Sequence, residues 1–458
     1  MGKLRFLLVL WFTKCTRAFM RLVGRNATYL PGSLALRFCP GFMGYMEMPK
    51  TVIAVTGSDG KTTTSNMLID ILTRRGLRVM NNQLGSNVPA GIATSFIQSC
   101  SLTGKAKCDA AVLEVDERSS HRIFDHVTPD ILCITNLFRD SLMRNAHPQY
   151  IADFIERAVP KGTRLVVCAD DLISNRIAPD NPRVYFGIGP LPTDVKECIN
   201  RINDMQICPI CHAQLEYDYR RYHHIGHAHC PKCGFASPDA DYLAHDVDTS
   251  AMTMTVTDKG GSGQYRLVSD SVFNIYNMTA AIAVLREFGM SHEELTEAFT
   301  HVSVVSTRYD EEDAGNVRII MQMSKDKNSL AGSRAFDYIS SKPGDKELIL
   351  MMNCLHDQQS WSENISWLYD CDFEFLNKPN IKRIVCTGPR AKDYVLRLQL
   401  AGFPAERILC TEKELDAPSL LEYTPGESVV VFYGTDALDL VAAVREETRK
   451  QAERRAAK

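Results

Sequence analysis

Short apolar runs alternate with longer amphipathic stretches from residue 51 onward. The runs are rich in valine, isoleucine and leucine, and they occupy Thr51–Val55, Ala110–Val115, Ile131–Asn136 and Arg164–Ala169. Helical periodicity fills the intervals, for example from Lys61 to about Arg75 and near Tyr150–Val159. Apolar strands that alternate with helices are typical of a parallel sheet with helices on both faces. This part of the chain is therefore predicted to be an α/β domain.

The same alternation returns near residue 307. Strands are expected at Val317–Met323, Glu347–Met352, Arg383–Thr387 and Ser428–Tyr433, and a charged helix over Leu440–Lys458. The segment Pro190–Pro192 interrupts the first block, and a cysteine- and histidine-rich stretch follows at 205–236. We therefore divide the chain into an N-terminal helical segment (1–45), a central domain (46–306) that contains the 205–236 insertion, and a second α/β domain (307–458).

The first 45 residues combine an apolar run with basic residues. The run Phe6–Phe12 is too short to span a bilayer, and no cleavage site typical of a signal peptide follows it. A turn is expected at Tyr29–Ser33. Two interpretations of the helix stay open. Its apolar face docks on the next domain, or the helix lies on the inner membrane surface with its basic residues on one side.

The composition is that of an ordinary globular protein. Of the 458 residues, 45% are hydrophobic and 23% are charged, and the net charge of −3 gives no electrostatic reason to expect nucleic acid as a partner. Cysteine occurs 15 times. Most of these cysteines stand alone, several within apolar runs, which indicates reduced thiols and a cytoplasmic protein rather than a disulfide framework.

The segment Val55–Thr64, V-T-G-S-D-G-K-T-T-T, directly follows the first predicted strand. Its glycines allow a tight turn whose N–H groups point at phosphate oxygens, and the helix that follows adds its positive dipole end. A P-loop of this short form predicts that Lys61 reaches the β- and γ-phosphates and that the Thr62 hydroxyl binds Mg²⁺. The predicted nucleotide-binding residues here are Gly57, Gly60, Lys61, Thr62 and Thr63.

Two further strand or helix ends carry candidate ligands. Glu114 closes the predicted strand before two more acids, Asp116 and Glu117, and is our first choice as a Mg²⁺ ligand beside the P-loop. Asn274 and Asn277 open an alanine-rich helix, where Asn277 could bond an adenine edge, although such an asparagine is more often a helix cap.

Four cysteines form one spaced cluster, C-P-I-C at 208–211 and C-P-K-C-G at 230–234. Two C-x-x-C turns at this distance predict a zinc ribbon in which Cys208, Cys211, Cys230 and Cys233 bind Zn²⁺. Because four thiolates close the tetrahedral shell, the ion is expected to be structural, and the weaker alternative is a redox pair. The histidines between the turns are expected to be packing or exposed residues.

No serine, cysteine or histidine arrangement typical of a hydrolase or glutaminase nucleophile is found in the sequence. The sequence also has no GTPase-like switch pattern. The simplest reaction class for it is therefore phosphate activation of a substrate carboxylate. ATP would form an acyl-phosphate, and an amine would then displace the phosphate.

These motifs together resemble the Mur ligase family. The family's P-loop is matched by Thr56–Thr63, its strand-end glutamate by Glu114 and its T-N-x-x-x-D segment by Thr135–Asp140. The resemblance also places Asn274–Asn277 and, more loosely, Arg308 among the nucleotide-binding residues. It implies a central P-loop domain with a parallel sheet, followed by a C-terminal α/β domain.

The inserted four-cysteine ribbon resembles the MurT branch of that family. Other segments that match this branch are Leu30–Gly32, Leu113–Glu117, Asn136–Asp140, His224–Phe235 and Ser366–Glu374. The resemblance implies that ATP and Mg²⁺ are used to amidate the D-glutamate α-carboxylate of lipid II, at the inner membrane face, to D-isoglutamine. The ammonia would come from a separate GatD-type glutaminase subunit, whose Cys-His pair an acid of this C-terminal domain would complete.

Three segments depart from the family pattern. Asn364 stands where the family usually has an aspartate, so either Asn364 or Asp370 is left for the partner-completing role. Ser141–His147 lacks an acid that the family has near the substrate, and Lys325–Gly332 is lengthened. Two alternatives to amidation therefore stay open: a Mur-fold amide ligase with a different acceptor, and an ATP-binding scaffold of a cell-wall complex.

Overall fold

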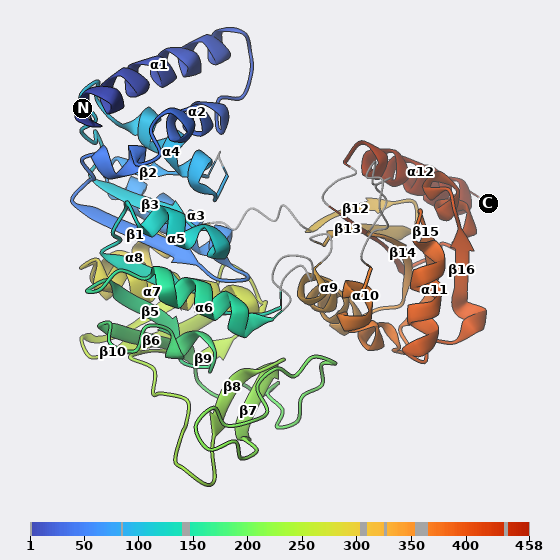
Figure 1. The fold of residues 1–458 in the computed structure, drawn as a ribbon. Coiled ribbons are helices and arrows are strands. Elements are labelled where there is room, and N and C mark those ends of the chain that lie inside the picture. Colours follow the sequence, from blue (N-terminus) through green and yellow to red (C-terminus); the bar gives the residue numbers. More distant parts are fainter. Residues whose placement is uncertain are drawn as a thin grey trace. The chain divides into compact units, whose positions relative to one another are not determined.

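The computed structural model describes residues 2–83, 86–139, 147–302, 309–324, 328–352, 365–434 and 438–457. They form two compact units, which Figure 1 shows as ribbons. The first unit consists of Met1–Phe138, Pro148–Ile199 and Asn203–Val304. The second consists of Arg139–His147, Asn200–Ile202 and Val305–Lys458.

A nine-stranded sheet forms the centre of the first unit, in the order β11-β10-β9-β6-β5-β4-β1-β3-β2. Its parallel part contains β1 (Thr51–Thr56), β2 (Val79–Asn81), β3 (Ala110–Glu114), β4 (Ile131–Ile134), β5 (Arg164–Cys168), β6 (Arg183–Ile188) and β9 (Tyr242–Asp248). The predicted parallel α/β sheet is thus confirmed. The strands β10 (Thr253–Asp258) and β11 (Gly261–Arg266) extend it antiparallel, which the sequence did not predict.

Helices cover both faces of this sheet. The helices α4 (Pro89–Ser99), α5 (Ser120–Phe124) and α6 (Pro148–Ala158) share one apolar cluster with alternate strand residues such as Ala54 and Leu132. The helices α3 (Lys61–Arg74) and α7 (Val272–Glu287) contact the same strands but contribute nothing to that cluster, so they cover the other face. The short helix α8 (His292–Phe299) packs against β11.

The N-terminal helices α1 (Gly2–Leu22) and α2 (Leu30–Phe38) and the turn η1 (Phe42–Tyr45) pack at one end of the first unit, beside α4 (Figure 1). The turn expected at Tyr29–Ser33 is wrong, because α2 begins there. Pro31 lies in the first helical turn, where its missing N–H is not needed. A Cβ on Gly32 would lie 1.9 Å from the Ala90 carbonyl oxygen, so this glycine lets α2 approach α4 closely. Among the described helices, none has both the length and the apolar character required to cross a membrane.

The predicted insertion contains an antiparallel hairpin of β7 (Glu216–Tyr222) and β8 (Ile225–His229). Its apolar side chains are continuous with the core, since Leu215, Tyr217 and Ala228 belong to the same buried cluster as the strands of the large sheet. The ribbon is therefore packed on the first unit and is not a free appendage.

The second unit is built on a six-stranded sheet, in the order β12-β13-β17-β14-β15-β16. Its strands are β12 (Tyr309–Ala314), β13 (Val317–Met323), β14 (Lys346–Met351), β15 (Ile381–Thr387), β16 (Ile408–Thr411) and β17 (Ser428–Tyr433). All pairs are parallel except β12 with β13. The helices are α9 (Ser329–Ser341), α10 (Trp367–Asp370), α11 (Ala391–Leu400) and α12 (Leu438–Ala456). The predicted second α/β domain is thus present.

Candidate active site: a P-loop beside a zinc ribbon

The P-loop joins β1 to α3 through two glycines with positive φ. Gly57 has φ of 129° and Gly60 has φ of 83°, and side chains rarely adopt either conformation. Both glycines are also sterically confined. A Cβ on Gly57 would lie 2.3 Å from Thr135 Oγ1, and one on Gly60 would lie 2.0 Å from Asn277 Oδ1. The loop therefore requires glycine at both positions.

Side chains from the end of β4 hold this loop in place. Thr135 Oγ1 donates to the Asp59 carbonyl at 2.6 Å, and Asn136 Oδ1 accepts from the Asp59 N–H at 3.1 Å. The Ser58 hydroxyl accepts from the Phe138 N–H at 2.8 Å and donates to the Phe138 carbonyl at 3.0 Å. The T-N-L-F segment that carried the family resemblance thus forms a clamp on the P-loop.

The first turn of α3 provides donors for an anion. The N–H groups at the start of a helix have no carbonyl one turn earlier, and Gly60 has no side chain to cap them. The first backbone hydrogen bond of α3 runs from the Thr64 N–H to the Gly60 carbonyl, at 2.9 Å. Thr62 is exposed and Thr63 is half-buried at this helix start. Together with the glycine cradle, these donors fit a bound phosphate.

Lys61 lies against a buried carboxylate that the sequence analysis did not single out. Its Nζ is 2.6 Å from Glu117 Oε1 and also donates to the Gly57 carbonyl. The Glu117 side chain is only 2% exposed. Burial raises the pKa of the Glu117 carboxyl, while the Lys61 ammonium opposes that shift. A preformed ammonium–carboxylate pair therefore occupies the position next to the phosphate donors.

Glu114, the last residue of β3, is held by two asparagine side chains. Its Oε1 accepts from Asn87 Nδ2 at 3.1 Å, and its backbone N–H and carbonyl bond the side chain of Asn82. Of the three acids after β3, Glu117 is the one that contacts Lys61. The burial of Glu117 against Lys61 could not be predicted from the sequence, because all three acids stand at the end of the same apolar run.

Asn277 of α7 meets the P-loop, as its closeness to Gly60 shows. It is 7% exposed, and its Nδ2 lies 3.4 Å from Asn274 Oδ1 one turn earlier. Ser271, not an asparagine, is the N-cap of this helix. The structure thus brings Asn277 to the loop with Asn274 beside it, and their role at an adenine edge stays a prediction.

The predicted partner-completing residue Asp370 lies in the second unit. Asp370 ends α10, and its Oδ2 lies 3.8 Å from Nη1 of Arg139 in the same unit. Asn364 and Arg308 lie outside the described residues, as do Ser141–Ala146 and Lys325–Lys327 within the departing segments.

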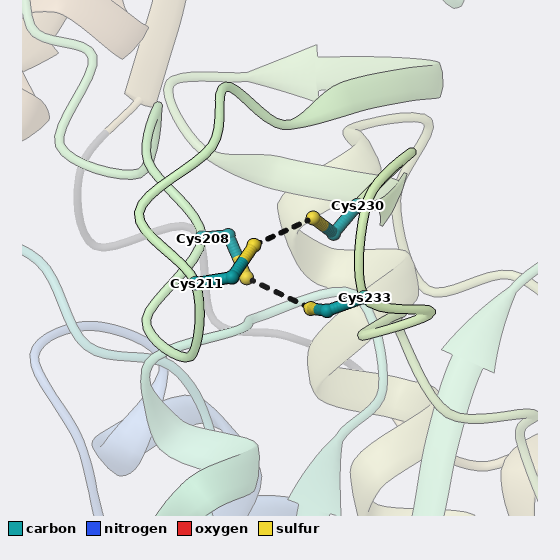
Figure 2. Close-up of side chains that lie close together, drawn as sticks. All are labelled: Cys208, Cys211, Cys230 and Cys233. Carbon is teal, nitrogen blue, oxygen red and sulfur yellow. Dashed lines mark hydrogen bonds between the residues drawn. The ribbon is translucent and has the colours of Figure 1, made fainter.

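The four predicted zinc ligands converge. Their Sγ atoms all lie within 4.8 Å of one another, with 3.5 Å between Cys208 and Cys233 and 3.4 Å between Cys211 and Cys230. Figure 2 shows one pair on each of two facing turns, with the sulfurs pointing inward. Four thiolates around Zn²⁺ at about 2.3 Å would be spaced at such distances. The donor set therefore fits a closed structural zinc site.

Backbone donors favour the thiolate form at Cys208 and Cys230, whereas the neighbouring cysteines raise the pKa of Cys233 to about 12. The Lys232 N–H donates to Cys230 Sγ at 3.4 Å, and the Ile210 N–H donates to Cys208 Sγ at 3.4 Å. Desolvation by itself would raise the pKa of Cys230, but hydrogen bonds from the backbone of Lys232 and Cys233 lower that pKa to about 6. Thiolate is the form that binds metal.

The hairpin tip of the ribbon contacts the clamp of the P-loop. The Phe138 ring lies 4.8 Å from the His224 ring and 5.8 Å from the Tyr222 ring, between centroids. The Tyr222 ring is in turn 4.3 Å from the Phe273 ring at the start of α7. At the tip of the hairpin, His224 is fully buried and acts as a packing residue. Nearer the base of the hairpin, histidines such as His227 are partly exposed.

The fold and the P-loop define a Mur-type ligase. The model of the Mur ligase middle domain matches residues 55–187, and that of the MurT ligase C-terminal domain matches residues 326–435. Solved structures share the fold. One is the pseudomurein peptide ligase type C from Methanothermus fervidus, at TM-score 0.65 and 21% identity over 89% of this chain and 80% of that one. Another is MurF ligase from Thermotoga maritima in complex with ADP, at TM-score 0.59 and 15% identity over 93% and 85%.

Sequence relatives make the assignment narrower. The lipid II isoglutaminyl synthase (glutamine-hydrolyzing) subunit MurT of Staphylococcus aureus (strain COL) is 31% identical over 400 residues, which are 85% of this chain and 86% of that protein. The subunit of the same name from Streptococcus pneumoniae is 31% identical over 395 residues, 84% of this chain and 85% of that protein. The chain belongs to the MurT family of Mur-type ligases.

Proposed function

We propose that this chain is the synthetase subunit that amidates the D-glutamate α-carboxylate of lipid II to D-isoglutamine, with ATP and Mg²⁺. The observation that carries the proposal is the formed P-loop, in which Lys61 and the uncapped start of α3 lie beside the two glycines with positive φ. The names of the relatives, which align with most of the chain, supply the substrate and the reaction.

Gly57, Gly60 and the N–H groups of Thr62 and Thr63 would hold the phosphates. ATP supplies the phosphoryl group that turns the substrate carboxylate into an acyl-phosphate, and ammonia then replaces the phosphate. Lys61 would stabilise the negative charge on the transferred group. Asn274 and Asn277 would face the adenine, and Arg308 would complete the nucleotide site from the start of the C-terminal domain.

We also propose that Glu117 shares the Mg²⁺ with Thr62, in addition to or in place of Glu114. Glu117 is the carboxylate beside Lys61, at 2.6 Å, whereas Glu114 bonds Asn87. The Glu117 carboxylate and the Thr62 hydroxyl would hold the cation, which would help to neutralise the charge of the phosphates. Phosphates would then replace Glu117 as the counter-charge of Lys61.

The ammonia would come from a separate GatD-type glutaminase that forms a heterodimer with this chain. The sequence offers no glutaminase nucleophile of its own. Asp370 or Asn364 would complete the partner's active site. Because lipid II is a membrane-anchored acceptor, the complex would work in the cytoplasm at the inner face of the membrane.

The test is amidation of lipid II by the purified full-length chain with ATP and ammonium chloride, read by mass spectrometry and phosphate release. Free ammonia makes the partner unnecessary. We expect the amide product, its loss in Lys61→Ala, and its retention in Lys259→Ala, which removes a lysine that is 93% exposed. No product from a chain that binds ATP would contradict the proposed acceptor. It would favour a different acceptor, or the scaffold role if no acceptor is found.

A further inference from the structure

Helix α1 has two apolar faces, and the first unit buries only one of them. On the inner face, Phe6, Leu10 and Thr13 are at most 1% exposed, and the Phe6 ring packs 5.0 Å from the Phe42 ring. The outer face presents Leu4, Leu8, Trp11, Phe12, Phe19 and Leu22, all between 45% and 86% exposed. At about 3.6 residues per turn these six positions fall within an arc of roughly 100°, opposite the buried positions.

The exposed apolar surface continues beyond the helix. The Phe12 ring meets the Phe38 ring of α2 edge-on, with 6.0 Å between centroids. Trp11 Nε1 donates to the Leu102 carbonyl at 2.8 Å, and the Leu102 side chain is 65% exposed. We call these side chains the α1 patch: Leu4, Leu8, Trp11, Phe12, Phe19, Leu22, Phe38 and Leu102. A contiguous apolar patch of this kind marks an interaction site, unlike single exposed leucines.

Positive charge borders the α1 patch, and nothing in the segment neutralises it. Residues 1–46 contain seven lysines and arginines and no acid, in a chain whose net charge is −3. None of these seven side chains forms an ion pair with any residue that the structure describes. At about 100° per residue, Arg5 falls beside Phe12 at one edge of the stripe, and its Nε donates to the carbonyl of Phe38. Lys3, Arg17 and Arg21 share the side of α1 that carries Leu10. Burial and the nearby charge of Arg21 lower the pKa of Arg17.

We propose that the α1 patch docks on an anionic phospholipid bilayer, with α1 lying in the plane of the membrane surface. Exposed aromatic and aliphatic side chains would enter the headgroup–acyl boundary, and the flanking lysines and arginines would contact lipid phosphates. The uncompensated positive charge favours an anionic bilayer over the apolar groove of a protein. The end of the first unit at which α1 and α2 lie would thus face the membrane (Figure 1).

The proposal goes beyond the reaction proposed above, and its test involves neither nucleotide nor acceptor. The full-length chain is floated with vesicles of phosphatidylcholine alone or with phosphatidylglycerol added. We expect binding to the anionic vesicles only, and its loss near 1 M salt, where the Debye length is about 3 Å. The double variant Phe12→Glu/Phe19→Glu should bind at least roughly ten-fold more weakly.

The matched control is Leu396→Glu/Leu400→Glu, which adds the same charge at apolar side chains of α11 that are 45% and 62% exposed. It should float like the unmodified chain, and both variants should keep the circular dichroism spectrum of the folded chain. Arg17→Gln/Arg21→Gln should weaken flotation while leaving the apolar stripe intact. Failure of the unmodified chain to float, or equal loss in the control, overturns the proposal.

Two other occupants of the patch give different outcomes. If Phe12→Glu/Phe19→Glu leaves flotation unchanged but lowers the mass of the vesicle-free chain in light scattering, the patch joins two copies of this chain. If that variant leaves flotation unchanged but no longer co-purifies with a co-expressed glutaminase, the patch binds the partner subunit. Either result overturns membrane docking.

Discussion

Gly57, Gly60 and Glu117 set the geometry of the P-loop at the scale of single residues. The glycines were predicted, because only they allow a tight turn before a phosphate-binding helix, and both have positive φ. Glu117 was not preferred over its neighbours, because a strand that ends in three acids does not show which of them turns inward. Its burial against Lys61 depends on the η2 turn (Glu117–Ser119), where the chain leaves the strand.

Gly60→Ala should abolish ATP binding as well as lower stability. The added methyl would lie 2.0 Å from Asn277 Oδ1, and left-handed φ costs an alanine about 1–2 kcal/mol. The control is Gly76→Ala, at φ of 87° with nothing within 4 Å of the new Cβ. Gly60→Ala should lose at least as much stability in urea as Gly76→Ala, and only Gly60→Ala should lose binding in calorimetry. Equal ATP affinity of the two variants would contradict the requirement for glycine at position 60.

Glu117→Gln should lower turnover about a hundred-fold and raise the Mg²⁺ concentration needed for half-maximal rate. Loss of the carboxylate beside Lys61 would remove one of the proposed ligands of the cation. Glu114→Gln is the comparison, and we expect it to shift the Mg²⁺ dependence less. Steady-state rates over a Mg²⁺ titration decide between them, and the reverse order would restore Glu114 as the main ligand.

At the scale of elements, apolar runs predicted β1, β3, β4 and β5 of the first sheet and β13, β14, β15 and β17 of the second. They did not predict the other strands, and they missed helix α2. The helix α2 begins over a Pro-Gly sequence that is typical of turns, because Pro31 fits a first helical turn and Gly32 fits the contact with α4. The strands β10 and β11 have many polar residues on an edge of the sheet, so no apolar run marked them. The zinc turns were predicted because ligand spacing is a local property.

Zinc removal should weaken ATP binding although the metal is not at the nucleotide. The ribbon tip packs on Phe138, whose backbone bonds Ser58 of the P-loop. We expect one zinc per chain by elemental analysis, its loss in Cys208→Ser/Cys230→Ser, and a roughly ten-fold weaker affinity for ATP. Cys410→Ser, at an exposed cysteine, should keep both. Unchanged affinity in a folded zinc-free chain would show that ribbon and loop are not coupled.

Asp171 should make the attachment of the ribbon sensitive to acid. Its fully buried carboxylate accepts from the Leu137 N–H at 2.8 Å and lies 3.1 Å from His224 Nε2. Burial by itself would raise the pKa of Asp171, but the hydrogen bond and charge of His224 leave it below the ordinary value of 3.8. A carboxyl with a lowered folded-state pKa stabilises the fold above its unfolded pKa, and this contribution is lost as pH falls through the folded pKa.

The measurement compares urea unfolding of the unmodified chain and Asp171→Asn at neutral pH and in acid. The variant should be less stable near pH 7, and the difference should shrink below about pH 4. Asp313→Asn, at a side chain that is 80% exposed, should stay within about 0.5 kcal/mol of the unmodified chain. A difference that is constant with pH would rule out the carboxylate as its source.

At the scale of the whole molecule, two α/β units each have their own sheet and core. The first unit contains the P-loop, the ribbon and the α1 patch, and the second contains Asp370. The relatives that match most of the chain are named as subunits of a glutamine-hydrolyzing synthase. In the function proposed above, a separate glutaminase would therefore supply the ammonia.

Asp370→Asn should abolish amidation with glutamine in the complex and leave amidation with ammonium chloride unchanged. An aspartate can stabilise a charged histidine in the partner, and an asparagine cannot. Asp313→Asn in the same unit should keep both activities. Both nitrogen sources are assayed by mass spectrometry of lipid II. If Asn364→Ala, and not Asp370→Asn, loses only the glutamine-dependent activity, the role belongs to Asn364.

The sequence by itself determined four strands of the first parallel sheet (β1, β3, β4 and β5), the P-loop and the four-cysteine cluster. Each depends on neighbours along the chain: apolar runs, glycine positions that permit positive φ, and the spacing of paired thiols. Tertiary structure decided that Glu117 meets Lys61, that the ribbon tip supports the P-loop through Phe138, and that one face of α1 stays uncovered. Each of these features depends on contacts between residues that are distant in sequence. Which of several similar neighbours becomes buried is decided only when the core forms.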